Sequence, residues 1–269
     1  GYMFESALQA GFISSGMDVT LLGPLPTPGV SFLANSNNQV GLVISASHNL
    51  FEDNGIKFFN KDGQKFSLEL ERRIEAKLTQ EMTAVESINL GKASRMNDAQ
   101  GRYIEFCKSS FTNLDLSGLS ILLDCANGAT YSVAPSVFCE LGATVDTIGA
   151  SPDGININQN CGSTSPDFLQ EEIAKGDYDI GIAFDGDGDR ILVVSSEGTV
   201  LDGDDILYIL SKDLSNESGV IGTLMTNKAL ELYFEEQGIN FSRADVGDKY
   251  VLNALVSNKW ELGGEPLVI

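Results

Sequence analysis

The chain has 269 residues, of which 42% are hydrophobic and 20% charged, so it carries enough apolar material for two or three small domains. Its 17 basic and 38 acidic residues give a net charge of −21, which repels phosphate backbones and anionic lipid and argues against nucleic acid and membrane surfaces as partners. A site for an anionic substrate must therefore be made positive locally, by a few Lys or Arg residues or by a metal ion.

The cysteines and the apolar segments indicate the cellular compartment of the protein. The four cysteines lie far apart and form no Cys-x-x-Cys pair, which indicates free thiols in a reducing compartment. The uncharged stretch over residues 19–51 contains three prolines and many polar residues, so it does not predict a membrane span. No signal peptide is recognisable, and we expect a cytoplasmic protein.

A unit made of a helix, a glycine and a short β-like run occurs three times along the chain. Glycine ends a helix at little steric cost because it adopts the left-handed conformation, and Val, Thr and Ile favour the strand that follows. Three such copies predict three similar α/β domains in series. The expected helices cover residues 6–16, 134–142 and 229–238, and the expected strands cover residues 17–23, 143–149 and 239–247.

Four further apolar runs are expected to be strands that lead into polar loops. Continuous apolar strands followed by polar loops are typical of buried sheets whose carboxyl ends carry function. The runs cover residues 40–44, 119–123, 178–184 and 220–225.

The domain boundaries are expected in polar segments. An amphipathic helix over 68–78 precedes a polar connection over 79–97, and a helix over 98–106 enters the second domain. A turn at 195–198 and an acidic segment at 202–205 separate the second domain from the third. The predicted domains are residues 1–98, 99–198 and 199–269.

The strand over 178–184 leads into the most informative motif, Asp-Gly-Asp-Gly-Asp-Arg at residues 185–190. Three carboxylates at alternate positions of a tight loop can converge on one hard cation, for which oxygen ligands favour Mg²⁺, Mn²⁺ or Ca²⁺. An EF-hand is excluded because Arg190 and Ser196 stand where that motif requires Gly and Glu. A solvated acidic turn is the plainer interpretation, but it needs a counter-charge, and Arg190 supplies only one.

The same loop has a second interpretation. Phosphatases of the haloacid dehalogenase type also place an aspartate loop after an apolar strand, with the pattern Asp-x-Asp-x-Thr/Val. Here the fifth position is Asp189, so the match is incomplete. In that alternative Asp185 would attack the phosphate.

The strand over 40–44 leads into Ser45-Ala46-Ser47-His48-Asn49, with Lys57 shortly after. Serine is a weak nucleophile unless a base or a metal activates it, and small neighbours at a strand end are expected to expose the Ser47 hydroxyl. A protease-type triad is not indicated, since His48 adjoins Ser47 and is not expected to reach back to it. Together with the carboxylate loop, a serine able to carry phosphate and two or three cations indicate a phosphoryl-transfer centre.

These motifs resemble those of the α-D-phosphohexomutases, and the matches cover nearly the whole chain in the order of that family. The resemblance implies tandem related α/β domains, each three-layered with a mixed sheet, together with an amino-terminal strand and a fourth domain that are absent from this chain. The matching segments are residues 43–49, 53–59 and 185–190, supported by 124–129, 152–158, 161–164, 246–251 and 263–266.

Within that family the motifs are most similar to those of the bacterial members that interconvert glucosamine 6-phosphate and glucosamine 1-phosphate through a 1,6-bisphosphate. The expected partner is then a small phosphorylated amino sugar, and a homodimer is left open. A sugar-phosphate-binding relative without turnover is a further alternative, against which the intact serine and aspartates argue. The implied residues are Ser47 as the phosphate carrier, Ser47, Asp185, Asp187 and Asp189 as Mg²⁺ ligands, Lys57, Arg190 and His48 as catalytic groups, and Glu265 and Lys249 as substrate-binding groups.

A catalytic role of Lys57 in proton transfer depends on its pKa. It can act as an acid or base only if its pKa is lowered, and a neighbouring cation such as Arg190 is the expected cause.

Three positions depart from the family pattern. Leu50 stands where a proline usually follows the Ser-His-Asn segment, and Ser165 stands where a histidine is common. Pro266 is followed directly by Leu267, whereas the sugar loop of the family continues with Ser-Gly-His. Those three residues are either deleted or left out of the given sequence, and the second interpretation is favoured because the following residues continue the loop well.

Overall fold

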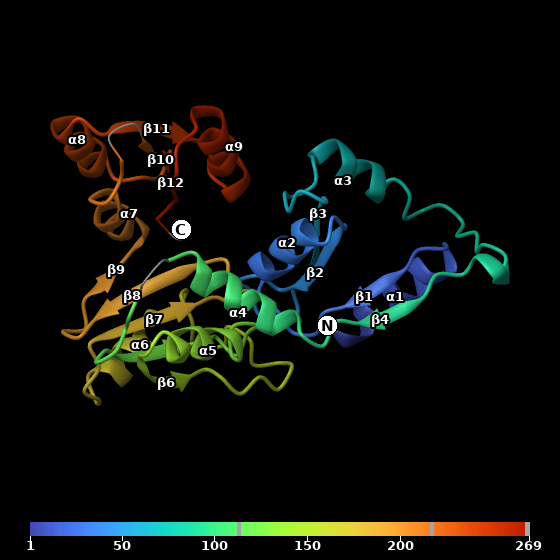
Figure 1. Ribbon diagram of the computed structural model, residues 1–269, viewed down its shortest axis with the longest axis horizontal. Helices are drawn as coiled ribbons and strands as arrows, with labels where there is room; N and C mark the ends of the chain where they lie inside the picture. The colour runs from blue at the N-terminus through green and yellow to red at the C-terminus, as the bar shows by residue number, and fades with distance from the viewer. Residues whose placement is uncertain (112–113, 216–217, 267–269) are drawn as a thin grey trace.

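The computed structural model describes residues 1–111, 114–215 and 218–266 (Figure 1). The position after Pro266, where the sequence departs from the family pattern, lies outside the described residues. Within these ranges no helix has the length and apolar character needed to cross a membrane. All four cysteines are free thiols.

The first part of the chain forms two small sheets with helices around them. Strand β1 pairs with β4 in parallel, and β2 pairs with β3 as an antiparallel hairpin. Helix α2 packs on this hairpin, where a Cβ at Gly41 would lie 3.0 Å from the Cβ of Ala34. The elements are α1 (Tyr2–Ser14), β1 (Val19–Leu21), α2 (Thr27–Ser36), β2 (Gly41–Ser45), β3 (Gly55–Phe59), α3 (Leu68–Glu75), a 3₁₀ turn (Ser87–Asn89) and β4 (Ala93–Arg95).

The prediction of a plain connection over 79–97 is wrong at its end. Residues 93–95 form β4, which pairs with β1 from much earlier in the chain. All three residues of β4 are exposed and two of them are polar, so the segment lacks the apolar signal of a strand. The predicted helix over 68–78 ends earlier, at Glu75.

The second part forms a three-layer unit around a five-stranded sheet with the order β6-β5-β7-β8-β9. The first three of these strands are parallel, and β8 and β9 are antiparallel to their neighbours. Along β5, Ile121 and Leu123 pack in the cluster with α5, whereas Leu122 packs in the cluster with α6. The elements are α4 (Ala99–Ser109), β5 (Ser120–Asp124), α5 (Val133–Glu140), β6 (Thr144–Ile148), α6 (Pro166–Ile173), β7 (Ile180–Phe184), β8 (Ile191–Ser195) and β9 (Val200–Leu201).

The third part is a smaller parallel sheet with the order β11-β10-β12. Asp202 and Asp205 form a capping box at the start of α7, so the acidic segment that marks this boundary is a helix start. The elements are α7 (Gly203–Ser211), β10 (Gly219–Thr223), α8 (Lys228–Gln237), β11 (Asn240–Ala244), α9 (Asp248–Asn258) and β12 (Leu262–Gly263).

The predicted helix-glycine-strand unit is confirmed in all three parts. Gly16, Gly142 and Gly238 each follow a helix and have φ angles of 83°, 101° and 71°. The tandem α/β architecture is therefore confirmed, with a mixed sheet in the second part.

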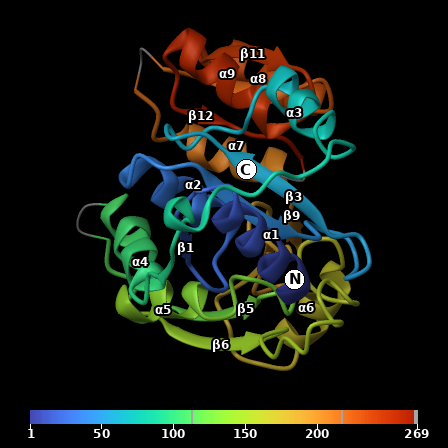
Figure 2. The ribbon, with the colours of Figure 1, turned by 90° about the vertical axis from the view of Figure 1, so that its right-hand side faces the viewer.

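The second and third parts are stacked on one another, and the first part lies beside them (Figure 1). Seen from that side, the first part stands in front of the other two (Figure 2). Helix α2 shares one apolar cluster with the second part, in which Leu33 lies with Tyr103 of α4 and Val133 of α5. The two loops with chemical motifs are thus carried by domains joined through a common core.

Candidate active site

The loop between β7 and β8 brings the three aspartates together. One carboxylate oxygen from each of Asp185, Asp187 and Asp189 lies within 4.8 Å of the others. Asp185 is fully buried, and Asp187 is 3% exposed. Gly188 has a φ of +69°, and a Cβ there would lie 2.5 Å from Thr130, so the tight path needs glycine.

The donor set fits a hard cation. Oδ2 of Asp185 and Oδ1 of Asp187 are buried and have no hydrogen-bond partner among the described residues. Burial, with repulsion from Asp187 and Asp189, raises the pKa of Asp185 to about 7. A metal ion held by the three carboxylates would satisfy the free oxygens and offset this repulsion.

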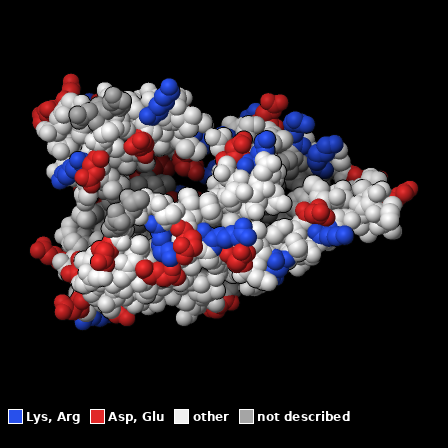
Figure 3. Space-filling model, in the orientation of Figure 1, with Lys and Arg blue, Asp and Glu red and all other residues white. Residues whose placement is uncertain are grey.

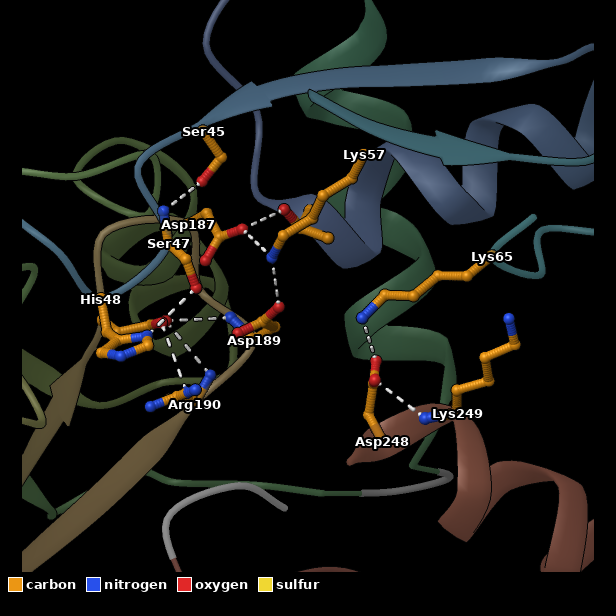
Figure 4. A network of polar contacts seen from close by, with 12 residues as sticks. Ser45, Ser47, His48, Lys57, Lys65, Asp187, Asp189, Arg190, Asp248 and Lys249 are labelled. Atoms are coloured by element: carbon orange, nitrogen blue, oxygen red, sulfur yellow. Dashed lines mark hydrogen bonds and ion pairs between the residues drawn. The ribbon is translucent and has the colours of Figure 1, made fainter. Parts of the chain in front are cut away.

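The backbone of Ser47 determines where its hydroxyl lies. Ser47 follows β2 and has a φ of +54°, and its N–H donates to Oγ of Ser45 at 2.7 Å. Its Oγ lies 3.3 Å from Nδ1 of His48, so the expectation that His48 does not reach Ser47 is wrong. The left-handed conformation at Ser47 turns the two adjacent side chains toward one another (Figure 4). Burial and the nearby Arg190 lower the pKa of His48.

Lys57 joins the two loops. It lies on β3 opposite Val43 of β2. Its Nζ lies 2.6 Å from Oδ2 of Asp187 and 2.9 Å from Oδ2 of Asp189. Burial alone would lower its pKa, but these two ion pairs outweigh burial and raise it. The condition for an acid or base role, a lowered pKa, is therefore not met, because the neighbours of Lys57 are carboxylates rather than a second cation.

Arg190 ends the aspartate loop. Its Nε lies 3.9 Å from Oδ2 of Asp185, and its side chain is 22% exposed. The backbone N–H of Arg190 also donates to Oδ1 of Asp185 at 3.2 Å. The guanidinium group and the His48 ring lie on the same side of the site as Ser47 (Figure 4).

Sequence reasoning missed Thr27. Its Oγ1 donates to Oδ2 of Asp187 at 2.5 Å, and its backbone N–H donates to the carbonyl of Asp187 at 2.8 Å. Thr27 begins α2 and is only 4% exposed. A threonine between Pro26 and Pro28 gives no sequence signal of this role, because its partner lies 160 residues away.

The two substrate-binding candidates lie together in the third part. Nζ of Lys249 donates to the carbonyl of Phe66 at 2.8 Å, and beside it Lys65 pairs with Asp248 (Figure 4). Oε2 of Glu265 accepts a hydrogen bond from the N–H of Gly247, next to this segment.

A cavity of about 200 Å³ links Lys249 to the aspartate loop, since Lys65, Lys249 and Asp189 line it, whereas Glu265 is not among its lining residues. Basic and acidic residues are interspersed on the face that Figure 3 shows, and no large positive patch covers the described residues of that face. The positive charge that an anionic ligand needs must therefore come from a few basic residues close to the site. A larger cavity of about 440 Å³ lies at the ends of β5 and β6, and its lining residues, which include Asn127 and Gln159, are all uncharged. We place the candidate site at the aspartate loop and the Ser47 loop, which the smaller cavity adjoins through Thr27 and Asp189.

The chain matches three descriptions of one protein family in series. They are the alpha/beta/alpha domains I, II and III of phosphoglucomutase/phosphomannomutase, over residues 1–85, 101–198 and 202–266.

Two curated bacterial relatives carry the name phosphoglucosamine mutase. That of Legionella pneumophila (strain Corby) is 55% identical over 98% of this chain, and that of Pseudomonas entomophila (strain L48) is 56% identical over 98%. The chain spans 60% and 61% of the length of these relatives.

Solved structures share the fold. A phosphoglucomutase/phosphomannomutase family protein of Burkholderia thailandensis has a TM-score of 0.81 at 24% identity, over 99% of this chain and 60% of that one. The N-acetylphosphoglucosamine mutase of Aspergillus fumigatus, in complex with GlcNAc-6P and magnesium, has a TM-score of 0.58 at 18% identity, over 89% and 62%.

Proposed function

Because this chain belongs to the phosphoglucomutase/phosphomannomutase family, we propose that its protein is a phosphosugar mutase that works through a phosphoserine at Ser47. One observation carries the proposal. Residues from two domains meet in one cluster (Figure 4). Lys57 pairs with Asp187 and Asp189, and Arg190 lies beside Asp185. A Cβ at Gly186 of the aspartate loop would lie 2.7 Å from the carbonyl oxygen of Ser47. Phosphoryl transfer depends on such positioning and charge stabilisation more than on covalent chemistry by the protein.

In the proposed reaction a phosphoryl group passes between Ser47 and the sugar. The phosphoryl group leaves Oγ of Ser47 for the 1-hydroxyl of glucosamine 6-phosphate, so one P–O bond breaks, another forms, and the hydroxyl proton ends on Oγ. The bisphosphate turns over in the site, and Ser47 then takes the phosphoryl group from carbon 6, which leaves glucosamine 1-phosphate. His48 lies within hydrogen-bond distance of Oγ and is suited to hold or orient the proton there.

Lys57 and Arg190 are assigned to charge rather than to proton transfer. The pKa of Lys57 is raised, so this residue stays protonated and balances the carboxylates. Arg190 supplies a second cation beside Asp185. Both positive charges can stabilise the negative charge of the transferring group.

We assign Mg²⁺ to Asp185, Asp187 and Asp189, with the serine phosphate as a further ligand. Three buried carboxylates suit a hard divalent cation, and the Aspergillus fumigatus relative was solved with magnesium. When bound, the ion neutralises charge between the carboxylates and the phosphoryl group.

The sugar is proposed to be glucosamine phosphate, from the names of the bacterial relatives. Lys249 and Glu265 are the proposed sugar-phosphate contacts, since they lie on adjoining segments and Lys249 lines the cavity beside Asp189. The cytoplasmic location stays a prediction, and the free thiols are compatible with it.

The haloacid dehalogenase alternative loses support from the geometry of Asp185. This residue is fully buried, and its Oδ1 already accepts hydrogen bonds from two backbone N–H groups. An attacking carboxylate needs access to the phosphorus atom.

The test is a steady-state assay of the full-length protein with glucosamine 6-phosphate, glucose 6-phosphate and mannose 6-phosphate. We expect the highest kcat/KM for the amino sugar and no turnover by Ser47→Ala. Release of inorganic phosphate without any 1-phosphate product would contradict the mutase assignment. A preference for mannose 6-phosphate would change the sugar and leave the mechanism in place.

A further inference from the structure

Asn158 connects the second domain to the serine loop of the first. It lies between β6 and α6 and is 6% exposed. Its Nδ2 donates to the carbonyl of Ser47 at 2.9 Å and to the carbonyl of Asn49 at 2.7 Å. Because both partners are carbonyl oxygens, the amide nitrogen must face them, and this fixes the orientation of the side chain.

The backbone of Asn158 is anchored to the sheet that carries the aspartate loop. Its N–H donates to the carbonyl of Ala126, just beyond β5, at 2.9 Å. Its φ is +57°, a conformation that asparagine tolerates better than most residues. Farther along the same segment, the N–H of Gly162 donates to the buried carboxylate of Asp124 at 2.6 Å. The donor that reaches Ser47 therefore stands on a rigid support.

The Asn158 segment, the Ser47 loop and the aspartate loop are closely packed against one another. A Cβ at Gly186, within the aspartate loop, would lie 2.7 Å from Nδ2 of Asn158 and 2.7 Å from the carbonyl oxygen of Ser47. Ser47 itself has a left-handed backbone, which costs free energy for a residue other than glycine and persists only when its surroundings hold it. The two hydrogen bonds from Asn158 are part of those surroundings.

We propose that Asn158 is a positioning residue for phosphoryl transfer. It holds the Ser47 loop against the aspartate loop, so that Oγ stays at the distance and angle that transfer requires. This inference rests on the proposed mutase function. A displacement of about 1 Å at a reacting group can lower a rate by about 100-fold, so a clamp on the carbonyl of Ser47 acts on kcat.

The experiment compares two pairs of variants in the full-length protein. Asn158→Asp keeps the shape and the tolerance of a left-handed backbone but replaces the donor by an oxygen, and Asn158→Ala removes the donor without adding charge. Asn160 is the matched control because it lies two residues away with a φ of +56° and an exposed side chain. Asn160→Asp and Asn160→Ala make the same chemical changes away from Ser47.

We expect kcat of the Asn158 variants to fall by about 10- to 100-fold, with KM and Mg²⁺ affinity within about twofold of wild type. Backbone amide exchange measured by mass spectrometry should accelerate in the peptide that spans Ser47 to Asn49. The Asn160 variants should match wild type in every measurement.

Results that contradict the positioning role differ from results that contradict the proposed function. Unchanged kcat and unchanged exchange in the Asn158 variants would overturn the positioning role. So would a parallel loss of Mg²⁺ affinity and kcat in both variants, because that pattern indicates a general structural role. A wild-type protein with no mutase activity would instead overturn the proposed function, while the exchange data would still show whether Asn158 restrains the loop.

Discussion

The first domain contacts its two neighbours in different ways. Toward the second domain it buries Leu33 against Tyr103 and Val133, and it adds an ion pair in which the side chain of Asp187 is 5% exposed. Toward the third domain the ion pair is Lys65 with Asp248, whose side chains are 28% and 51% exposed.

The difference matters because exposure sets the strength of an ion pair. Exposed pairs are screened by water and salt and contribute about 0–1 kcal/mol, whereas breaking a buried pair by removing one partner costs several times more. Apolar contacts are not screened by salt, and among the described residues the contact to the second domain combines an apolar cluster with a largely buried ion pair. The groups proposed to react lie on the firm contact, and the groups proposed to hold the sugar lie on the weak one.

We infer that a firm contact at the reacting groups and a weak contact at the sugar-binding groups suit the proposed phosphosugar mutase. Under this inference the firm contact keeps Ser47 at a fixed distance from the aspartate loop, and the weak contact leaves the third domain freer to move when substrate enters. Four substitutions probe these two contacts.

Asp187→Ala should abolish Mg²⁺ binding and lower turnover by at least about 1,000-fold, because it removes both a proposed ligand and the partner of Lys57. Titration calorimetry with Mg²⁺ and the mutase assay on the full-length protein measure the two effects. Asp177→Ala is the control, since Asp177 is an exposed acid in the same domain. Normal metal-dependent activity in Asp187→Ala would show that the metal site is wrongly assigned.

Lys57→Met should lower the free energy of unfolding by about 2 kcal/mol without Mg²⁺, because it leaves the buried Asp187 without its counter-charge. The figure is below that for a fully buried pair, since the Lys57 side chain is 23% exposed. Saturating Mg²⁺ should stabilise this variant more than it stabilises wild type. Equal stabilisation of both in denaturant titrations would contradict a shared site for Lys57 and the metal.

Thr27→Val should lower Mg²⁺ affinity by about 10-fold, because it removes the hydroxyl that orients Asp187 while keeping the shape of the side chain. The loss of one hydrogen bond to a charged group should also cost about 1.5 kcal/mol of stability. Ser36→Ala, at an exposed position near the end of the same helix, is the control for both measurements. An unchanged Mg²⁺ affinity in Thr27→Val would separate Thr27 from the site.

Lys65→Ala should have the smallest effect, a loss of about 0.5 kcal/mol that disappears in high salt. A double-mutant cycle with Asp248→Asn, run by thermal unfolding at low and high ionic strength, isolates the pair. A coupling above about 2 kcal/mol that persists in salt would mean that the third domain is held as firmly as the second.

The sequence predicts local features well and distant contacts poorly. The helix-glycine-strand units and the aspartate loop are readable because their signals lie within a few residues of one another. The hydrogen bonds from Thr27 to Asp187 and from Asn158 to Ser47 join residues that are 160 and 111 positions apart, and only the folded chain brings them together. Asn158 lies within a segment that matches the family pattern, residues 152–158, so the sequence indicates that this segment matters but not what Asn158 does.

One wrong expectation and one unmet condition have physical causes of the same kind. The left-handed backbone of Ser47, which lets its side chain meet His48, depends on support from another domain and leaves no trace in local sequence. The pKa of Lys57 is raised by carboxylates 130 and 132 residues away, whereas sequence reasoning considered only a neighbouring cation.

The most direct test of the central claim is the identity of the phosphorylated residue. The full-length protein is incubated with glucosamine 1,6-bisphosphate, digested, and analysed by phosphopeptide mass spectrometry before and after treatment with hydroxylamine. The account predicts an acid-stable phosphate on Ser47 that resists hydroxylamine and is absent from Ser47→Ala. A hydroxylamine-labile phosphate on Asp185, with Ser47 unmodified, would contradict it.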